Sequence, residues 1–185
     1  MAGKLFYVLG ASGAGKDSLI KAIREGFSES IMVAHRYITR PAEAGSENHV
    51  ALSEAEFACR VEHELFAMHW QANGHCYGLG IEIDHWISDG MHVMVNGSRA
   101  YLEEAQKKYG NKLQVVWVSV AKDVLRQRLL ARGRESEEEV EQRLLRAEQY
   151  NEVCPEGALR VDNSGSLSKA VTQLVGQLEV MVCRP

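Results

Sequence analysis

The sequence predicts an α/β fold of three layers (α/β/α), in which helices cover both faces of a mostly parallel sheet of five strands. Two observations lead to this prediction. Short apolar runs alternate along the chain with helical patterns, and strands that alternate with helices form parallel sheets. The composition, 45% hydrophobic and 25% charged over 185 residues, is that of one ordinary globular domain.

The individual elements follow from local pattern. Strands are expected at four apolar runs that border glycine-bearing turns: residues 4–10, 92–97, 113–120 and the first part of 158–166. Helical spacing extends over residues 16–27, 101–109, 121–133, 136–150 and 167–182. Ser136 precedes three glutamates, which predicts an N-cap at the helix that follows it. Residues 31–80 differ, because they combine β-like pieces with weak helical periodicity and many polar residues.

Charge and cysteine usage exclude several classes of protein. The net charge of −4 argues against a nucleic-acid binder, because a phosphate backbone requires a basic face. The four cysteines lack the spacing of a zinc site and predict free thiols in a reducing compartment. The first apolar run is too short for a signal or a membrane span. We therefore expect a cytoplasmic protein without membrane or nucleic-acid partners; the oligomeric state is left open, a dimer included.

The stretch GASGAGKDS, residues 10–18, follows an apolar strand and opens a helix, as a phosphate-binding loop requires. Glycines turn backbone N–H groups toward an anion, the lysine adds a positive charge, and the helix N-terminus adds its dipole. The residues predicted to bind the phosphates of ATP are Gly10, Ala11, Ser12, Gly13, Ala14, Gly15, Lys16, Asp17 and Ser18. The other interpretation is a flexible turn with a surface lysine.

Asp17 stands where such loops place a Ser or Thr that contacts Mg²⁺. A second strand usually supplies a carboxylate to the metal, but the run HVMVNGSRA ends in Asn96, Gly97 and Ser98. We hypothesise that Asp17 supplies the missing anionic oxygen to Mg²⁺, directly or through water. The alternative is that Asp17 only caps the helix.

With the loop placed, nearly the whole chain resembles the nucleoside monophosphate kinases of the guanylate kinase type. The matching stretches are GASGAGKDSL, HRYITRPAEAGSENHVALSEAEF, FAMHWQANGHCYGLG, GMHVMVNGSRA and LRQRLLARGRESEEEVEQRLLRA. The resemblance implies one guanylate kinase-like P-loop domain over residues 1–185. Its core would be about 1–30, 81–125 and 145–185, with an acceptor-binding subdomain at about 31–80 and a helical lid at about 126–144.

The lid of such an enzyme carries arginines that close on the phosphates. By resemblance these are Arg128, Arg132 and Arg143, which together with Lys16 would be the catalytic residues. Arg134 lies beside them in the sequence. Phosphoryl transfer depends on alignment and charge neutralisation, which bidentate guanidinium groups supply. Asn163, in the stretch VDNSGS, falls where related kinases pass the chain under the adenine; its turn chemistry alone also accounts for an Asx residue there.

The acceptor site departs from a guanylate kinase. The phosphate-holding Arg40 and Tyr77 are kept, whereas a second arginine of that family falls at Glu43 and a tyrosine at His49. The positions that would read guanine are Arg36, Met68, Leu79 and Ser98. A site stripped of its hydrogen-bonding partners loses discrimination for a base. Arg36 and Arg40, with the histidines His35 and His49, instead suggest an acceptor that carries more negative charge than a nucleoside monophosphate and has no base.

The combination of GKDS, AHRYITR, GSENH and VNGSRA closely resembles the ribose 1,5-bisphosphate phosphokinases of bacterial phosphonate catabolism. The resemblance implies transfer of the γ-phosphoryl group of ATP, with Mg²⁺, to ribose 1,5-bisphosphate, which gives 5-phosphoribosyl 1-diphosphate and ADP. The residues expected to bind this acceptor are Arg36, Arg40, His49, Tyr77, Asn96, Ser98 and Arg99. No general base is expected, since a phosphate oxygen is already largely ionised at neutral pH.

Three questions stay open at this point. Asp84 either faces the ribose hydroxyls or the metal, or it caps the helix before HWISDG. The chain could phosphorylate another small phosphorylated acceptor, or it could be a non-catalytic interaction module of the same fold. The intact Lys16 and lid arginines argue against the module.

Overall fold

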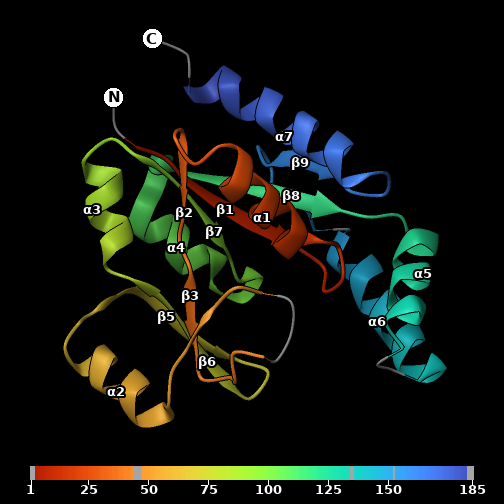
Figure 1. The fold of residues 1–185 in the computed structure, drawn as a ribbon, viewed down its shortest axis with the longest axis horizontal. Coiled ribbons are helices and arrows are strands. Elements are labelled where there is room, and N and C mark those ends of the chain that lie inside the picture. Colours follow the sequence, from red (N-terminus) through yellow and green to blue (C-terminus); the bar gives the residue numbers. More distant parts are fainter. Residues whose placement is uncertain (1–2, 44–46, 134–135, 152, 183–185) are drawn as a thin grey trace. The chain divides into compact units, whose positions relative to one another are not determined.

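The structure, a computed structural model, describes residues 3–43, 47–133, 136–151 and 153–182, without the side chains of Arg132, Asn151 and Val182 (Figure 1). The chain divides into two compact units. The first comprises Met1–Tyr7 and Ile23–Gln114, and the second comprises Val8–Ala22 and Val115–Pro185.

A central sheet of five strands has the order β2-β7-β1-β8-β9. The bounds of these strands are β1 Leu5–Gly10, β2 Ile31–Val33, β7 His92–Asn96, β8 Leu113–Ser119 and β9 Leu159–Asp162. Strand β2 pairs in parallel with β7, and β8 pairs in parallel with β9. Every residue of β1 is buried, as expected for a central apolar strand. The predicted α/β fold with a mostly parallel sheet is therefore confirmed.

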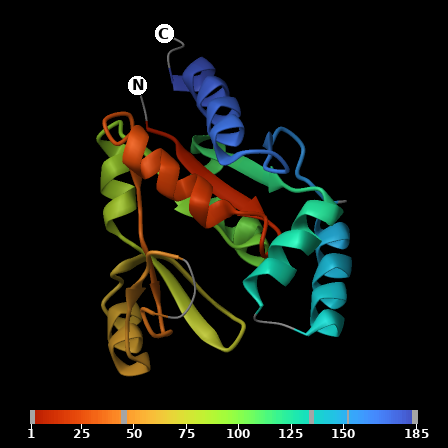
Figure 2. The same ribbon diagram turned by 45° about the vertical axis from the view of Figure 1, so that its right-hand side comes forward.

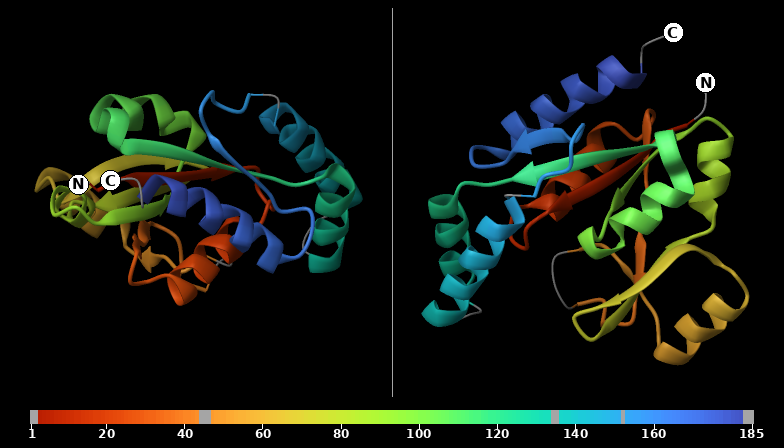
Figure 3. Two further views of the ribbon diagram at one scale, coloured as in Figure 1. Left: turned by 90° about the horizontal axis from the view of Figure 1, so that it is seen from above. Right: turned by 180° about the vertical axis from the view of Figure 1, so that it is seen from behind.

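The four longest helices are α1 Lys16–Gly26, which begins in the second unit and ends in the first, and α5 Lys122–Arg132, α6 Glu137–Asn151 and α7 Leu167–Val182 of the second unit. Helices α5 and α6 lie side by side (Figure 2) and are joined by the ion pairs Lys122–Glu148 and Arg126–Glu141. Helix α7 runs along β9 (Figure 3). The sequence pattern predicted all four to within two residues.

The expected N-cap of α6 is also confirmed. The Ser136 hydroxyl accepts a hydrogen bond from the backbone N–H of Glu139, and the Glu139 carboxylate accepts one from the backbone N–H of Ser136. This reciprocal capping box satisfies N–H groups that a helix start leaves without partners. It fixes the beginning of the helix that carries Arg143.

The first unit contains a second sheet of four strands in the order β4-β3-β6-β5. Its strands are β3 Arg36–Ile38, β4 Val50–Ala51, β5 Phe66–Ala72 and β6 His75–Gly80. Strands β5 and β6 form a hairpin whose tip, Asn73–Gly74, has positive φ at both residues, as a tight turn matched to strand twist requires. Helix α2, Glu54–Glu62, lies beside this sheet (Figure 1).

The two faces of the four-stranded sheet have different characters. On one face, Phe57 of α2 packs against Phe66 and Leu52, with Tyr37 and Cys76 beside them. Residues that pair across neighbouring strands share a face, so the register places Arg36, Leu79 and Met68 in one row on the other face. Ile38, Tyr77 and Trp70 form the next row of that face. The sheet thus presents Arg36, Tyr77 and Trp70 on the face away from α2.

Four helical segments complete the first unit: the helices α3 Glu82–Ser88 and α4 Leu102–Tyr109, and the short 3₁₀ turns Arg99–Tyr101 and Gly110–Lys112. Helix α2 had no counterpart in the sequence prediction, because only Phe57 of its nine residues is buried. Strand β2 also lies within the segment 31–80, so the fifth strand of the central sheet comes from its first residues. The division of the chain into core, acceptor-binding subdomain and lid stays a prediction.

Two smaller findings concern the cysteines and the helices. Cys59, Cys76 and Cys154 are free thiols, as predicted, and Cys183 lies outside the described residues. Within the described ranges, no helix combines the length and the apolar character that a membrane crossing requires.

Candidate functional site

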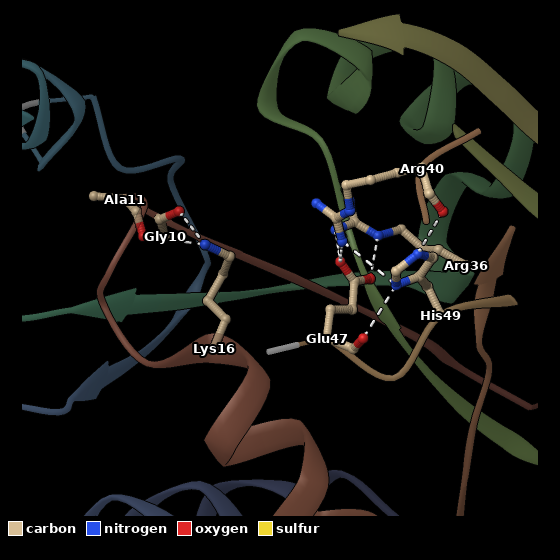
Figure 4. Close-up of polar contacts among 7 residues, drawn as sticks. All are labelled: Gly10, Ala11, Lys16, Arg36, Arg40, Glu47 and His49. Atoms are coloured by element: carbon tan, nitrogen blue, oxygen red, sulfur yellow. Dashed lines mark hydrogen bonds and ion pairs between the residues drawn. The ribbon is translucent and has the colours of Figure 1, made fainter. Parts of the chain in front are cut away.

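The phosphate loop connects β1 to α1 in the second unit. Gly13 and Gly15 have φ of 91° and 87°, a left-handed conformation that only glycine adopts without strain. The Lys16 ammonium group donates hydrogen bonds to the carbonyl oxygens of Gly10 and Ala11 at 2.7 and 3.1 Å (Figure 4). These contacts hold the lysine charge over its own loop, where a bound polyphosphate would meet it.

Asn163 supports the loop from behind. It is buried, and its amide Nδ2 donates to the Ala14 carbonyl at 2.7 Å. A side chain at position 15 would collide with the same Nδ2 atom, so the glycine permits this contact. The carbonyl of Asn163 accepts a hydrogen bond from Arg128 of α5 at 2.8 Å. Asn163 therefore has a positioning role that the sequence did not predict, and its contact with adenine stays a prediction.

Two of the predicted lid arginines lie next to the loop within the second unit. Arg128 reaches the Asn163 carbonyl, as described, and Arg143 of α6 donates to the Ser12 hydroxyl at 3.3 Å. Arg132 is the last residue of α5, and its side chain lies outside the described residues, as does all of Arg134. Helices α5 and α6 thus place the guanidinium groups of Arg128 and Arg143 next to the glycine-rich loop.

Asp17 lies half-buried in the first turn of α1, where the positive end of the helix dipole favours a carboxylate. Ser18 follows it and is exposed. Over the described ranges, no three side chains of the His, Cys, Asp and Glu types gather into a group that could hold a metal by themselves. The contact of Asp17 with magnesium therefore stays a prediction.

In the first unit, Arg36 and Arg40 share one carboxylate, that of Glu47 (Figure 4). Arg36 donates from Nε and Nη2 to the two oxygens of Glu47, each at 2.5 Å, which is a bidentate ion pair. Arg40 Nη2 lies 3.7 Å from Glu47 Oε2. The side chains of Arg36 and Glu47 are each only 12% exposed, so solvent screens this pair weakly.

His49 and Tyr77, two further residues predicted to bind the acceptor, belong to the same cluster. The buried His49 lies 3.4 Å from Arg40 Nη2 through Nδ1 and 3.1 Å from the Arg40 carbonyl through Nε2. The Arg36 guanidinium lies over the Tyr77 ring, 5.0 Å from its centroid, a cation–π contact. His35 does not join the cluster and instead contacts Arg24 and Asn48. Glu43 is exposed.

The end of β7 carries the remaining predicted acceptor residues. Asn96 is buried, Ser98 is half-buried and Arg99 is exposed. The hydroxyl of Tyr7 in β1 accepts a hydrogen bond from the Ser98 backbone N–H at 2.8 Å and donates to the Ser98 carbonyl at 3.0 Å. Tyr7 therefore fixes the turn after β7, a role that its place in an apolar strand does not reveal.

The interpretation of Asp84 as a helix N-cap is wrong, and its contact with ribose or metal stays a prediction. Asp84 is the third residue of α3, whose N-cap is Ile81, so Asp84 does not cap the helix. Its carboxylate accepts hydrogen bonds from the Tyr109 hydroxyl at 2.6 Å and from Lys108 Nζ at 2.8 Å. Burial and this carboxylate raise the pKa of Tyr109, which keeps its hydroxyl a donor. Asp84 thus joins α3 to α4, and neither ribose nor metal is needed to explain it.

Two features of the acceptor cluster were missed by the sequence analysis. Glu47 was noticed only as part of GSENH, although a carboxylate near two arginines could have suggested a pair. Trp70 was not singled out from the sequence as an acceptor-binding residue, and it stacks on Tyr77, at 5.7 Å between ring centroids, and on Tyr101, at 5.5 Å. Strand alternation over FAMHWQA and HCYGLG would have placed Trp70 and Tyr77 on one face.

With this geometry in place, comparisons with known proteins show which family the chain belongs to. The sequence model of the guanylate kinase family matches residues 2–180. The chain therefore belongs to the guanylate kinase family. Among solved structures, a guanylate kinase from Anaplasma phagocytophilum superposes with a TM-score of 0.75 at 13% identity, over 99% of this chain and 88% of that one. That likeness shows the fold alone.

Within the family, the chain is similar to proteins named ribose 1,5-bisphosphate phosphokinase. The relative from Yersinia pestis is 51% identical over 171 residues, 92% of this chain and 89% of its own length. The relative from Enterobacter lignolyticus is 52% identical over 171 residues, with the same coverage of both chains. The predicted resemblance to this group is confirmed.

Proposed function

We propose that the protein is a ribose 1,5-bisphosphate phosphokinase that transfers the γ-phosphoryl group of ATP to the 1-phosphate of its acceptor. An oxygen of the 1-phosphate forms a bond to the γ-phosphorus, the bond from that phosphorus to the bridging oxygen breaks, and ADP leaves with the electron pair. The product is 5-phosphoribosyl 1-diphosphate. The attacking oxygen is already ionised, so no side chain has to remove a proton.

One observation supports this choice of acceptor above the others. On the face where a guanylate kinase-like enzyme would read a base, Met68 and Leu79 are apolar and almost fully buried, and the polar group in their row is the cation Arg36. A base would find no carboxylate there to bind its N–H groups, whereas a phosphate would find an arginine. The names of the relatives agree with this chemistry.

The chain's own residues supply alignment and charge. The loop and Lys16 hold the nucleotide phosphates, while Arg128 and Arg143 lie where guanidinium groups can neutralise charge that develops on the transferring group. Arg40 and Tyr77 hold one phosphate of the acceptor. Asn163 keeps the loop in place through Ala14.

Magnesium belongs to this proposal through Asp17. When bound, the ion would neutralise negative charge on the nucleotide phosphates. Asp17 is the residue that would hold it, because its half-buried carboxylate directly follows Lys16. Asp17 stands in the position where such loops usually have a Ser or Thr.

A coupled assay of ADP release tests the acceptor. We expect turnover with ATP and ribose 1,5-bisphosphate, and at least about 100-fold lower kcat/KM with GMP and AMP, since polar mismatch in a binding site discriminates by this order or more. Efficient turnover of GMP would contradict the interpretation of Met68 and Leu79. Absence of turnover with every acceptor would point to a non-catalytic module of the same fold.

Substitution of Asp17 tests the metal. We expect Asp17→Asn to raise the Mg²⁺ concentration needed for half-maximal kcat about 10-fold, because one charged oxygen ligand is lost. Thermal unfolding without nucleotide should change little, since the side chain lies at a helix start and not in the core. A variant with the wild-type dependence on Mg²⁺ would show that Asp17 only stabilises the helix.

A further inference from the structure

The acceptor cluster contains one carboxylate that the proposed reaction does not use. Glu47 brings a negative charge into a group of residues expected to bind phosphate, and it does so at the two arginines most suited to that task. An acceptor phosphate and this carboxylate seek the same guanidinium groups. The contacts of each arginine show where they compete.

Arg36 has little capacity left for a phosphate while Glu47 is bound to it. A guanidinium group binds a planar or tetrahedral oxyanion along one edge, with two parallel N–H donors. Glu47 occupies the edge formed by Nε and Nη2 of Arg36, and the Tyr77 ring lies against the flat face of the same group. A phosphate that binds the same edge of Arg36 through two hydrogen bonds must replace the Glu47 carboxylate.

Arg40 is held more loosely and is ready to accept an oxyanion. Its contacts to Glu47 and His49 are long, at 3.7 and 3.4 Å. Its Nε is buried, and among the described residues no acceptor lies within hydrogen-bonding distance of it. A buried donor without an acceptor costs free energy, which a bound phosphate oxygen would recover. Arg40 therefore points to an oxyanion at this place independently of Arg36.

The position of Glu47 in the chain allows it to move. It lies between β3 and β4, outside any helix or strand, three residues before β4 begins at Val50. Only its side chain holds Arg36, so displacement of the carboxylate breaks no backbone ladder. The ion pair can open while β3, with Arg36, stays in its sheet.

We propose that Glu47 is a specificity-determining residue, a displaceable carboxylate that occupies the phosphate-binding edge of Arg36 until a doubly phosphorylated acceptor replaces it. The inference rests on the proposed function and names the residue that enforces its acceptor class. A sugar bisphosphate binds Arg40 with one phosphate and Arg36 with the other. Its ion pair with Arg36 then compensates for the Arg36–Glu47 pair that is lost. An acceptor with one phosphate binds Arg40 and leaves the Arg36–Glu47 pair in place.

Calorimetric titration of Glu47→Gln with ribose 1,5-bisphosphate tests the proposal. We expect the dissociation constant to fall about 10-fold, because the amide competes less well than a carboxylate for a charge-assisted contact. Ribose 5-phosphate should gain clearly less from the same substitution. Glu56→Gln is the matched control, since it removes the carboxylate of another arginine pair, Arg60–Glu56, which is exposed on α2. Its affinities should equal those of the wild type.

Weaker binding of the bisphosphate by Glu47→Gln would overturn the proposal and make Glu47 a residue that orients Arg36 for the acceptor. Equal gains for both sugar phosphates would also overturn it. Glu47→Asp keeps the charge but shortens the reach, so its affinity should lie between those of the wild type and Glu47→Gln, and it serves if the amide variant does not fold. Failure of wild-type protein to release ADP with ribose 1,5-bisphosphate would reject the proposed function itself, whatever the affinities of the variants.

Discussion

Asn163 shows how a single residue can shape the phosphate loop through its contacts with other protein groups. Its side-chain amide donates to the Ala14 carbonyl, and its backbone carbonyl accepts from Arg128. The side chain packs where Gly15 has none. The three contacts tie the loop, the turn after β9 and helix α5 within the second unit. A residue in this position is sensitive to substitution even if no ligand reaches it.

The expected consequence can be separated from an adenine contact. Asn163→Ala should lower the free energy of unfolding by about 1–3 kcal/mol, since it leaves a buried carbonyl without its donor, and it should raise the KM for ATP. If Asn163 acts only on the loop, the ratio of kcat/KM for ATP to that for GTP stays at the wild-type value. A fall in that ratio would show that Asn163 also reads the base.

At the scale of elements, α3 and α4 are joined by one polar cluster. Asp84 accepts from the hydroxyl of Tyr109, which is buried, and from Lys108. Lys108 Nζ also donates to the Ala67 carbonyl in β5 at 2.6 Å, so the cluster extends to the four-stranded sheet. It supports the sheet that carries Arg36 and Tyr77.

Asp84→Asn should destabilise the fold by about 1–3 kcal/mol, because it removes the charged partner of two donors. The KM for the acceptor should stay within about twofold of the wild type. Tyr109→Phe, which keeps the ion pair with Lys108, should cost less, about 1 kcal/mol. Chemical denaturation measures the free energy of unfolding, and steady-state kinetics measure the KM. A large rise in KM with unchanged stability would show that Asp84 contributes to acceptor binding.

The junction of β1 and β7 predicts a dependence of stability on pH. His92 Nδ1 accepts a hydrogen bond from the backbone N–H of Lys4 at 3.1 Å, and burial, with the Lys4 charge, lowers the pKa of His92 below 6.5. The unfolded chain therefore binds a proton at higher pH than the folded protein. This contribution to stability is complete above the unfolded pKa and is lost as pH falls through 6.5 toward the folded value.

Thermal unfolding between pH 7.5 and 5 checks this expectation. His92→Asn keeps an oxygen that can accept from Lys4 but cannot bind a proton in this range, so its unfolding temperature should fall less steeply with acidity than that of the wild type. Parallel curves for the two proteins would show that the titration of His92 does not govern the slope.

At the scale of the whole molecule, the residues proposed to bind the nucleotide and those proposed to bind the acceptor belong to different compact units. Lys16, Asn163, Arg128 and Arg143 lie in the second unit, and Arg36, Arg40, Glu47 and Tyr77 lie in the first. Each set is held by contacts inside its own unit. We therefore expect the two ligands to stabilise the protein through separate residues.

Thermal shift measurements on two variants test this separation. A ligand at about 100 times its dissociation constant should stabilise the wild type by about 2.7 kcal/mol. Lys16→Met should lose the stabilisation by ADP and keep that by ribose 1,5-bisphosphate, whereas Arg40→Met should show the reverse. Loss of both effects in either variant would mean that the two sets of residues depend on each other for binding.

The sequence alone determined the α/β fold, the phosphate loop and the helices α5 and α6 with their arginines. These features are written in neighbouring residues, because strand and helix periods, glycines at positive φ and a capping box all act within a few positions. Resemblance then supplied the acceptor class, through Arg36, Arg40 and Tyr77. The same resemblance showed that Met68 and Leu79 replace residues that would bind guanine in a guanylate kinase.

Only the tertiary structure decided how these residues are used. Glu47 pairs with Arg36 from 11 positions away, Asp84 with Tyr109 from 25, and Tyr7 with Ser98 from 91. No period links such partners, since they meet through the register of a sheet or the packing of one element on another. A charge or hydroxyl is placed by its local segment, but its partner is chosen by the fold, which is why Arg36 looked like an open cation in the sequence and is a paired one in the structure.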